Sequence, residues 1–203
     1  PGNYITDNYL SDNLGYHQKV YAFYSELTFP VFKLFDAKIG ERYERTEINS
    51  YYSDAQQQQK VPGYNTFVPS IFFYKKTSEN SQIKLSYTKR IERPDYRDLN
   101  PFVNTSDPKN ITSGNPYLTP EIGNRIELAY SRDYGETGSF VISAFYRGNN
   151  HDIQDYIFYY PSLVVGDSTY TNVAVSTRRN IGLEKNMGLS LFGNINLNKK
   201  FSL

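Results

Sequence analysis

Acidic side chains recur at short spacing in two parts of the chain, and paired carboxylates could carry out the acid–base chemistry of a glycosidase. The two sets are Glu41, Glu44 and Glu47, and then Glu92, Asp95 and Asp98. A glycosidase holds its two carboxyl groups about 5–9.5 Å apart across a cleft. Successive residues on one face of a strand meet that spacing without any cleft, so the pattern is unspecific. Charges balanced by Arg42, Lys84 and Arg90 explain it better, and we predict no catalytic residue.

Thiol and metal chemistry lack their usual ligands in this sequence. The 203 residues contain no cysteine, which excludes disulfides, thiolate metal sites and a cysteine nucleophile. The two histidines, His17 and His151, are too far apart in sequence to suggest a histidine-rich metal site. The nucleophile-elbow, zinc-protease and P-loop motifs do not occur. We therefore predict no enzyme activity, no metal site and no cofactor.

The balance of charge and aromatic residues says more about the class of protein. Lys and Arg number 22 against 21 Asp and Glu, and the net charge of +1 argues against a nucleic-acid partner. The chain holds 20 Tyr and 13 Phe, although its mean hydropathy is −0.62. A polar average with so many aromatic residues does not suit a disordered chain. It is typical of strands with one wet face and one apolar face.

Polar and apolar residues alternate with a period of two along most of the chain, which predicts β-strands. Between 82 and 93, Ile83 and Leu85 fall on one face, whereas Lys84 and Arg90 fall on the other. The pattern predicts seven strands, at 17–28, 33–47, 64–75, 82–93, 121–132, 139–149 and 181–197, with Phe201 to Leu203 beginning an eighth. We expect an antiparallel up-and-down meander with no parallel pair and under about a tenth of the residues helical.

The two faces of these strands indicate a membrane. Most of the strands reach the ~9–11 residues that cross a bilayer, beyond the ~5–6 usual in soluble sheets. Burying unpaired ions such as Arg42, Glu44 and Lys84 would cost several kcal/mol each, so the charged face must meet water. The apolar face, which includes Phe35, Ile39 and Leu85, must therefore contact an apolar environment. The fold class is therefore all-β, a partial transmembrane β-barrel with open edges near 17–28 and 181–197.

Short and long connections alternate along the chain. Short ones lie near 29–31, 75–81, 133–138 and 198–200, and long ones run through 47–63, 94–120 and about 153–174. Every second turn therefore emerges on the same side, as in outer-membrane barrels with tight periplasmic turns and long external loops. No run of 18 apolar residues occurs, and Pro1 does not open a targeting segment. We expect the chain to be a piece of a longer protein.

Tyrosines gather in the expected external loops. Together with one arginine they give the candidate ligand-binding residues: Tyr51, Tyr52, Tyr96, Arg97 and Tyr117. Such rings can stack on a sugar or a chelate at an external mouth. More often, loop tyrosines belong to an aromatic girdle at the membrane interface or pack within their loops. A girdle or an extended hairpin suits Tyr156, Tyr159 and Tyr160 best.

The most distinctive stretch follows the strand at 82–93. It reads R-P-x-Y-x-x-L-N-P-F and then G-N-P-x-L-x-P-E, carried by Arg93, Pro94, Tyr96, Leu99, Asn100, Pro101, Phe102, Gly114, Asn115, Pro116, Leu118, Pro120 and Glu121. This stretch resembles the barrel signature of TonB-dependent outer-membrane receptors, especially the Bacteroidota type, which includes SusC-like and siderophore receptors. Gly182-Leu183-Glu184 is similar to a strand entry common in that family. The resemblance is specific over 85–200 and diffuse over 17–84.

The resemblance implies a fold, a location and partners. Such receptors have a barrel of about 22 strands, an N-terminal plug and an energy-coupling box, so residues 1–203 would be about a third of one barrel domain, in its C-terminal part, without the plug. The motif residues would be structural: Arg93, Pro94, Asn100, Pro101, Gly114, Asn115, Pro116, Pro120 and Glu121. The intact protein would lie in the bacterial outer membrane and take up a scarce nutrient: a metal chelate, a cobalamin-like cofactor or a glycan. Its partners would be membrane lipid, that nutrient, the TonB complex through the plug, and a surface lipoprotein.

Two alternatives from other classes remain open at this point. One is a passive barrel, such as a porin or an adhesion barrel, which would lack a plug in the full-length sequence. The other is a soluble all-β carbohydrate-binding module, which would be soluble without detergent.

Overall fold

Seven long strands form one antiparallel sheet in sequence order. The computed structural model describes residues 13–52, 61–198 and 201–202. The strands are β1 (Leu14–Val31), β2 (Phe35–Tyr52), β3 (Tyr64–Ser78), β4 (Ser81–Glu92), β7 (Glu121–Asp133), β8 (Gly138–Val165) and β9 (Ser168–Asn198). Each pairs with its predecessor in this series, and β1 forms one edge of the sheet. The predicted meander of seven strands is therefore confirmed.

Three short strands complete the sheet. β5 (Val103–Asn104) and β6 (Asn110–Ser113) lie in the connection between β4 and β7, and β10 (Phe201–Ser202) pairs with β9. β6 runs parallel to β9, with Ile111 opposite Val175. The expectation of no parallel pair was wrong, because the long connection folds back onto β9. In the described part of the chain, helix is limited to the 3-10 turn η2 (Gly135–Thr137), which is not a membrane-spanning helix.

The connection predicted at about 153–174 is strand, not loop. β8 has 28 residues and β9 has 31, and they continue together to a turn at Gly166 and Asp167. Gly166 has a φ of 57°, which a glycine adopts without steric cost. The aromatic and β-branched residues between Tyr156 and Val165 favour strand over loop. This prediction was therefore wrong, and the extended hairpin is the correct alternative.

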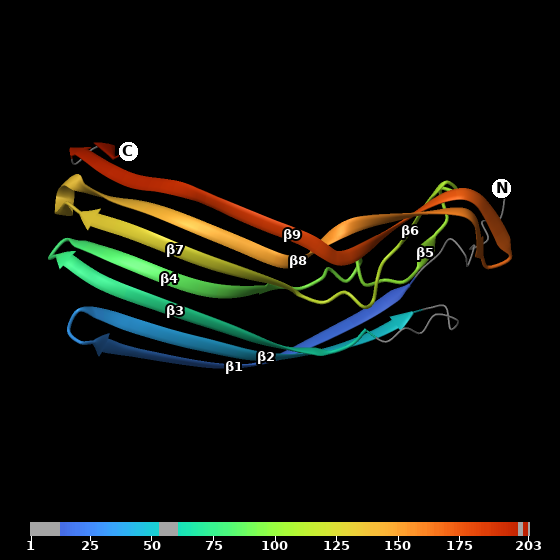
Figure 1. Ribbon diagram of the computed structural model, residues 1–203, viewed down its shortest axis with the longest axis horizontal. Helices are drawn as coiled ribbons and strands as arrows, with labels where there is room; N and C mark the ends of the chain where they lie inside the picture. The colour runs from blue at the N-terminus through green and yellow to red at the C-terminus, as the bar shows by residue number, and fades with distance from the viewer. Residues whose placement is uncertain (1–12, 53–60, 199–200, 203) are drawn as a thin grey trace.

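The connections alternate between the two ends of the sheet. Figure 1 shows the β1–β2, β3–β4 and β7–β8 turns at the left end, and the longer β4–β7 connection and the tip of the β8–β9 hairpin at the right end. The predicted alternation of short and long connections therefore holds as far as β8, and it was wrong for the β8–β9 connection, which is a short turn at Gly166 and Asp167. The short turn predicted at 198–200 lies mostly outside them, as does Leu203.

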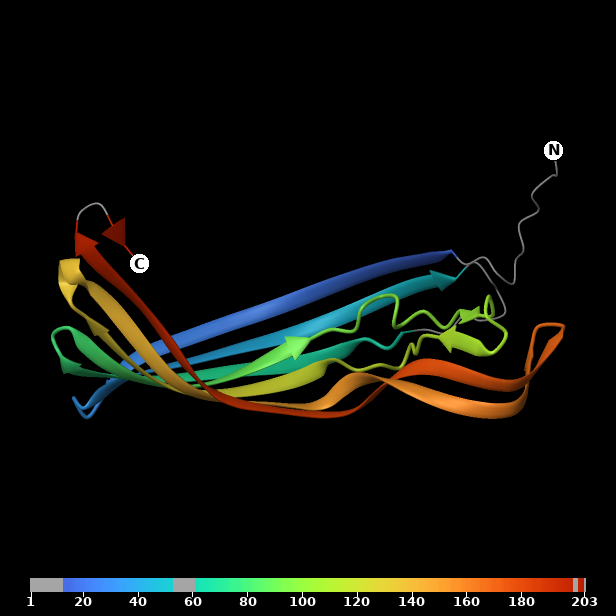
Figure 2. The same ribbon diagram turned by 90° about the horizontal axis from the view of Figure 1, so that it is seen from above.

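The register places the apolar and charged residues on opposite faces. One row across the sheet contains Ala37, Phe73, Leu85, Leu128, Ala144 and Leu189, and the next contains Ile39, Ile71, Tyr87, Ile126, Tyr146 and Met187. Met187 and Leu189 are 77% and 79% exposed, so this face is bare. Arg42, Glu44 and Lys84 belong to the opposite face, as predicted. Figure 2 shows that the sheet is curved and open.

A small hydrophobic core lies at the end of the sheet with the long connections. Ile48 of β2 and Val61 pack against Leu99 and Leu118 of the β4–β7 connection, and all four are buried. Tyr16, Tyr64 and Ile153 surround this cluster. Because the leucines come from the β4–β7 connection, whereas Ile48 lies in β2 and Val61 shortly before β3, the core fixes the connection against these strands.

Candidate functional site

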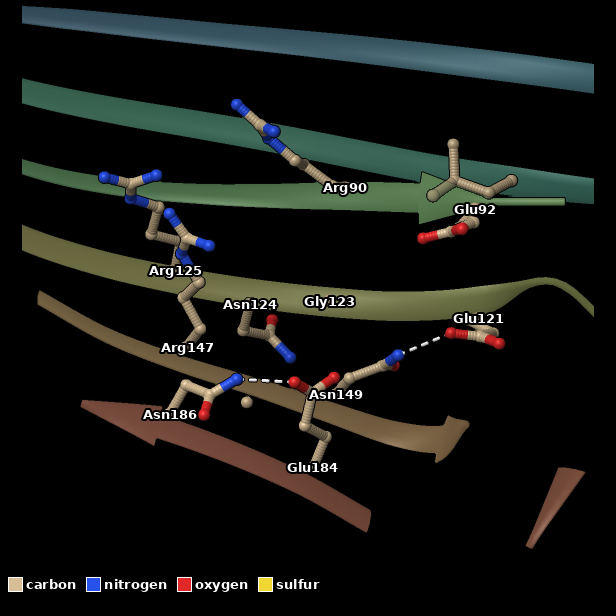
Figure 3. A pocket seen from close by; sticks show the side chains of 12 residues that line it. Arg90, Glu92, Glu121, Gly123, Asn124, Arg125, Arg147, Asn149, Glu184 and Asn186 are labelled. Atoms are coloured by element: carbon tan, nitrogen blue, oxygen red, sulfur yellow. Dashed lines mark hydrogen bonds between the residues drawn. The ribbon is translucent and has the colours of Figure 1, made fainter. Parts of the chain in front are cut away.

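A polar hollow of about 430 Å³ opens on the charged face where four strands lie side by side. Strands β4, β7, β8 and β9 all contribute to its wall. The lining residues are Arg90, Ile91, Glu92, Glu121, Gly123, Asn124, Arg125, Arg147, Gly148, Asn149, Glu184 and Asn186. Figure 3 shows Arg125 and Arg147 toward one end of the hollow and Glu92 and Glu121 toward the other, and the register places Arg90 and Glu184 in one row between them. The site is therefore polarised along the strands.

The arginines at the basic end differ in their partners. Arg125 forms an ion pair with Glu127, and its guanidinium carbon lies 5.6 Å from the centroid of the Phe145 ring. Arg147, opposite Arg125 in register, lies 5.1 Å from the same ring centroid on β8. Neither Arg90 nor Arg147 has an ion-pair partner within the described part of the chain. Two positive charges are therefore available to an anionic group in the hollow.

The acidic end is organised by Glu121. Its Oε2 accepts a hydrogen bond from Asn149 Nδ2 at 2.6 Å, and its Oε1 accepts one from the Ile153 backbone N–H at 2.8 Å. Glu121 is the first residue of β7, so these bonds join the start of that strand to β8. The Glu184 carboxylate accepts a hydrogen bond from Asn186 Nδ2 (Figure 3). The carboxylates of Glu121 and Glu184 therefore already accept hydrogen bonds from groups of the protein.

Arg93 and Glu44 form the best-buried ion pair of the charged face. Glu44 is 2% exposed and also contacts Arg42 on its own strand. Arg93 follows directly after β4, and Pro94 prevents that strand from continuing in the sheet ladder. The pair therefore anchors the point where the chain leaves β4.

The asparagine and glycine motif residues close the β4–β7 connection on itself. Gly114 N–H donates to the Asn100 carbonyl oxygen at 2.9 Å, and Asn115 N–H donates to that of Asp98 at 2.6 Å. A Cβ at Gly114 would lie 2.4 Å from the Asn100 carbonyl oxygen, so only glycine fits. Ser113 Oγ donates to the Pro101 carbonyl oxygen at 3.0 Å.

The same connection is fastened to β9. Asn115 Nδ2 donates to the Arg178 carbonyl oxygen at 3.0 Å, and Asn180 exchanges two hydrogen bonds of 2.9 Å with the backbone of Thr119. Arg178 Nε also lies 3.5 Å from Asp98 Oδ1. Near β6, the Asn110 side chain and the Lys109 N–H hold the pKa of Asp107 below its usual range. These contacts favour the predicted structural role of the motif, and Pro116 lies in the turn that follows Asn115.

The structure brings two of the predicted ligand-binding residues, Tyr96 and Arg97, into contact. Tyr96 packs on Tyr16 with ring centroids 6.1 Å apart, and Arg97 lies over the Tyr96 ring at 5.6 Å. Tyr51 and Tyr117 are 67% and 64% exposed, and among the described residues the Tyr96 ring packs on that of Tyr16 and not on either of these. The side chain of Tyr52 lies outside those residues. Their role in binding stays a prediction.

The sequence predictions missed the polar hollow. Arg90 was placed correctly on the charged face, but Arg147, Asn149 and Glu184 were not considered as site residues. The signal available was their alternation with apolar residues on neighbouring strands, which places them on one face once the register is known.

These features define a class of protein. Long antiparallel strands carry a bare apolar face and a charged face and follow one another in meander order, which is the construction of a transmembrane β-barrel. The family model described as the outer membrane protein beta-barrel family matches residues 1–203, and the chain belongs to that family. Its location is therefore the bacterial outer membrane, and the soluble-module alternative is excluded.

Solved structures of similar fold are receptors of that membrane. A mutant of the ferric enterobactin receptor PfeA of Pseudomonas aeruginosa aligns with 92% of this chain at 12% identity and a TM-score of 0.59. The hemophore receptor HasR of Serratia marcescens, in complex with its hemophore HasA and heme, aligns with 88% at 14% identity and a TM-score of 0.65. The siderophore receptor PirA of Acinetobacter baumannii aligns with 89% at 14% identity and a TM-score of 0.63.

The alignments cover only part of these receptors. This chain spans 34% of the PfeA chain, 32% of the HasR chain and 26% of the PirA chain. At such identities the likeness establishes the fold alone. A search of the curated proteins gives no match.

Proposed function

We propose that residues 1–203 form one segment of the barrel wall of a TonB-dependent receptor, whose plug lies elsewhere in the protein. The receptor takes up a scarce nutrient with energy from the TonB complex. The motif between Arg93 and Glu121 supports this proposal, as does the fold shared with siderophore and hemophore receptors. The proposal also includes membership of the SusC-like subgroup and a surface lipoprotein as a partner. It includes no enzyme activity.

The observation that carries the proposal is the polar hollow with its two unpaired arginines. It lies on the face opposite the apolar one, which in a closed barrel is the lumen. A passive pore needs only a hydrated wall, whereas a receptor needs side chains that bind a solute. Arg90 and Arg147 supply positive charges of that kind, which suits an anionic metal chelate better than a neutral glycan. Among the nutrients predicted from the sequence, the metal chelate is therefore the one we favour.

The test is uptake of radiolabelled ferric chelates by cells that carry the full-length receptor. We expect uptake to stop when the proton gradient is collapsed, and to fall at least tenfold at limiting chelate in the Arg90→Gln, Arg147→Gln double variant. The Lys76→Gln variant is the matched control, because Lys76 lies on the same face near the short turns. Uptake that continues unchanged after the proton gradient is collapsed would instead identify a passive barrel.

A further inference from the structure

The apolar face ends in aromatic side chains at the short-turn end of the sheet. The ring centroids of Tyr130 and Phe140 lie 5.8 Å apart, and Tyr134 stacks on Phe140 at 6.1 Å. On the same face, Phe35 and Phe73 form an edge-to-face pair at 5.4 Å. Outer-membrane barrels carry such aromatic girdles where the hydrocarbon meets the lipid headgroups, and their short turns are periplasmic. These rings therefore mark the level of the headgroups in the periplasmic leaflet.

Two cations belong to this end of the apolar face. The register places Lys75 in one row with Ile83 and Tyr130. Arg132 lies one row nearer the short turns, and its guanidinium carbon is 5.1 Å from the centroid of the Tyr134 ring. Both cations are exposed, and neither forms an ion pair within the part of the chain that the structure describes. Their charges are therefore available to an anion outside the protein.

The acidic side chains at the short-turn end lie elsewhere. Asp36 and Asp133 occupy the alternate positions of β2 and β7, so they belong to the charged face. Asp133 also accepts a hydrogen bond from the Gly135 N–H at 2.7 Å. Glu79 and Glu136 belong to the turns beyond the strand ends. At this end of the described strands, the charges on the apolar face are therefore all positive.

Three hydroxyl groups lie at the turn from β3, which carries Lys75, to β4, which is the neighbour of β7. Ser81 is the first residue of β4 and is opposite Arg132. Its Oγ lies 2.7 Å from Thr77 Oγ1 and 2.6 Å from Ser78 Oγ. Two hydrogen bonds join three hydroxyl groups, so one O–H remains to donate to an oxygen atom outside the cluster. Two cations with a hydroxyl donor between their strands suit a phosphate group.

The location in the outer membrane determines what covers this surface. The apolar side of β3, β4 and β7 faces lipid, and further strands of the barrel extend its wall at the edges of the sheet rather than over this side. Ile83, Leu85 and Leu128 of these strands are each more than a third exposed, so acyl chains can lie along them. A headgroup at the level of Lys75 and Arg132 therefore belongs to a lipid whose chains cover these residues.

We propose that Lys75 and Arg132 bind the phosphate of an anionic phospholipid in the periplasmic leaflet. Both side chains donate charge-assisted hydrogen bonds to phosphate oxygens, while their apolar stems lie along the lipid-facing strands. A zwitterionic headgroup also presents an ammonium group, for which this end of the apolar face offers no carboxylate on the described strands. An anionic headgroup therefore fits better. The site lies on the opposite side of the barrel wall from the polar hollow and does not depend on the proposed receptor function.

The test is native mass spectrometry of the detergent-purified full-length protein, titrated with dioleoyl phosphatidylglycerol or with dioleoyl phosphatidylcholine. We expect the first phosphatidylglycerol to bind at least fivefold more tightly than the first phosphatidylcholine. In the Lys75→Gln, Arg132→Gln double variant, the affinity for phosphatidylglycerol should fall to that for phosphatidylcholine. The matched control is the Lys38→Gln, Lys84→Gln double variant, which removes the same charge from the opposite face and should keep the preference.

Heat resistance of both double variants shows that the barrel is folded. An equimolar amount of glycerophosphoglycerol, which is the headgroup without its acyl chains, should not displace the lipid. Displacement would show a site for a free phosphodiester instead of a lipid, and would overturn the proposal. So would equal affinity of the unaltered protein for the two lipids, a preference that survives in the Lys75→Gln, Arg132→Gln variant, or an equal loss in the control.

Discussion

At the scale of single residues, the motif of the β4–β7 connection is explained by backbone contacts rather than by ligand chemistry. Gly114 sits where the backbone of residues 98–100 passes so closely that a side chain has no room. Asn115 joins that turn to β9 through its side chain. Glu44 and Arg93 satisfy each other where the connection begins. These contacts agree with the structural role that we predict for the motif.

Replacement of Gly114 by alanine should therefore loosen the connection. The new Cβ would lie within 3.0 Å of three backbone atoms of Asp98 and Asn100, and such overpacking costs about 1–3 kcal/mol. Gly123→Ala is the control, because a Cβ there meets nothing within 4 Å, and its cost should be below about 0.5 kcal/mol. Protease nicking of the connection in the detergent-solubilised receptor measures the effect. Equal nicking of both variants would contradict the account of Gly114.

At the scale of the strands, the two faces assign each residue to lipid or to water. The row that contains Leu85 is apolar across six strands, from Ala37 to Leu189. The neighbouring Lys84 faces the other way, with its Nζ 3.7 Å from Glu127 Oε1. A one-residue shift in the sequence therefore changes the surroundings from hydrocarbon to water.

A charge at position 85 should consequently impair assembly, whereas loss of the charge at position 84 should be mild. Arginine on the lipid face costs about 2–4 kcal/mol near the bilayer midplane. A partly exposed ion pair such as Lys84–Glu127 is worth about 0–1 kcal/mol. The measurement is the amount of heat-resistant, membrane-inserted receptor obtained with each variant, Leu85→Arg and Lys84→Gln. Similar assembly of both variants would show that the faces are assigned wrongly.

The strands were predictable from sequence because alternation and turn residues are local signals. The seven strands, their faces and the short turns follow from residues within one strand of each other. The parallel contact of Ile111 with Val175 and the Asn180–Thr119 bonds join residues about 60 positions apart, and no periodicity reports them. The polar hollow needs the register of four strands, so Arg147 and Glu184 could not be grouped from sequence.

At the scale of the whole molecule, the apolar face accounts for the location, and the proposed receptor function depends on the polar face. Large apolar side chains such as Met187 and Leu191 are more than three-quarters exposed, which a soluble sheet would bury. In the outer membrane the same residues meet lipid and the charged face becomes the wall of the lumen. The receptor proposal rests on this orientation of the sheet.

The most direct test of the orientation is a spin-label scan of β4 in the full-length receptor in lipid bilayers. The 203 residues contain no cysteine, so single cysteines at positions 83 to 91 can be labelled within this segment without background from it. We predict that labels at 83, 85, 87 and 91 are relaxed by oxygen, which partitions into lipid. Labels at 84, 86, 88 and 90 should instead be relaxed by a water-soluble nickel complex. Uniform accessibility along β4, or the reverse alternation, would contradict a barrel strand with its apolar face in the membrane.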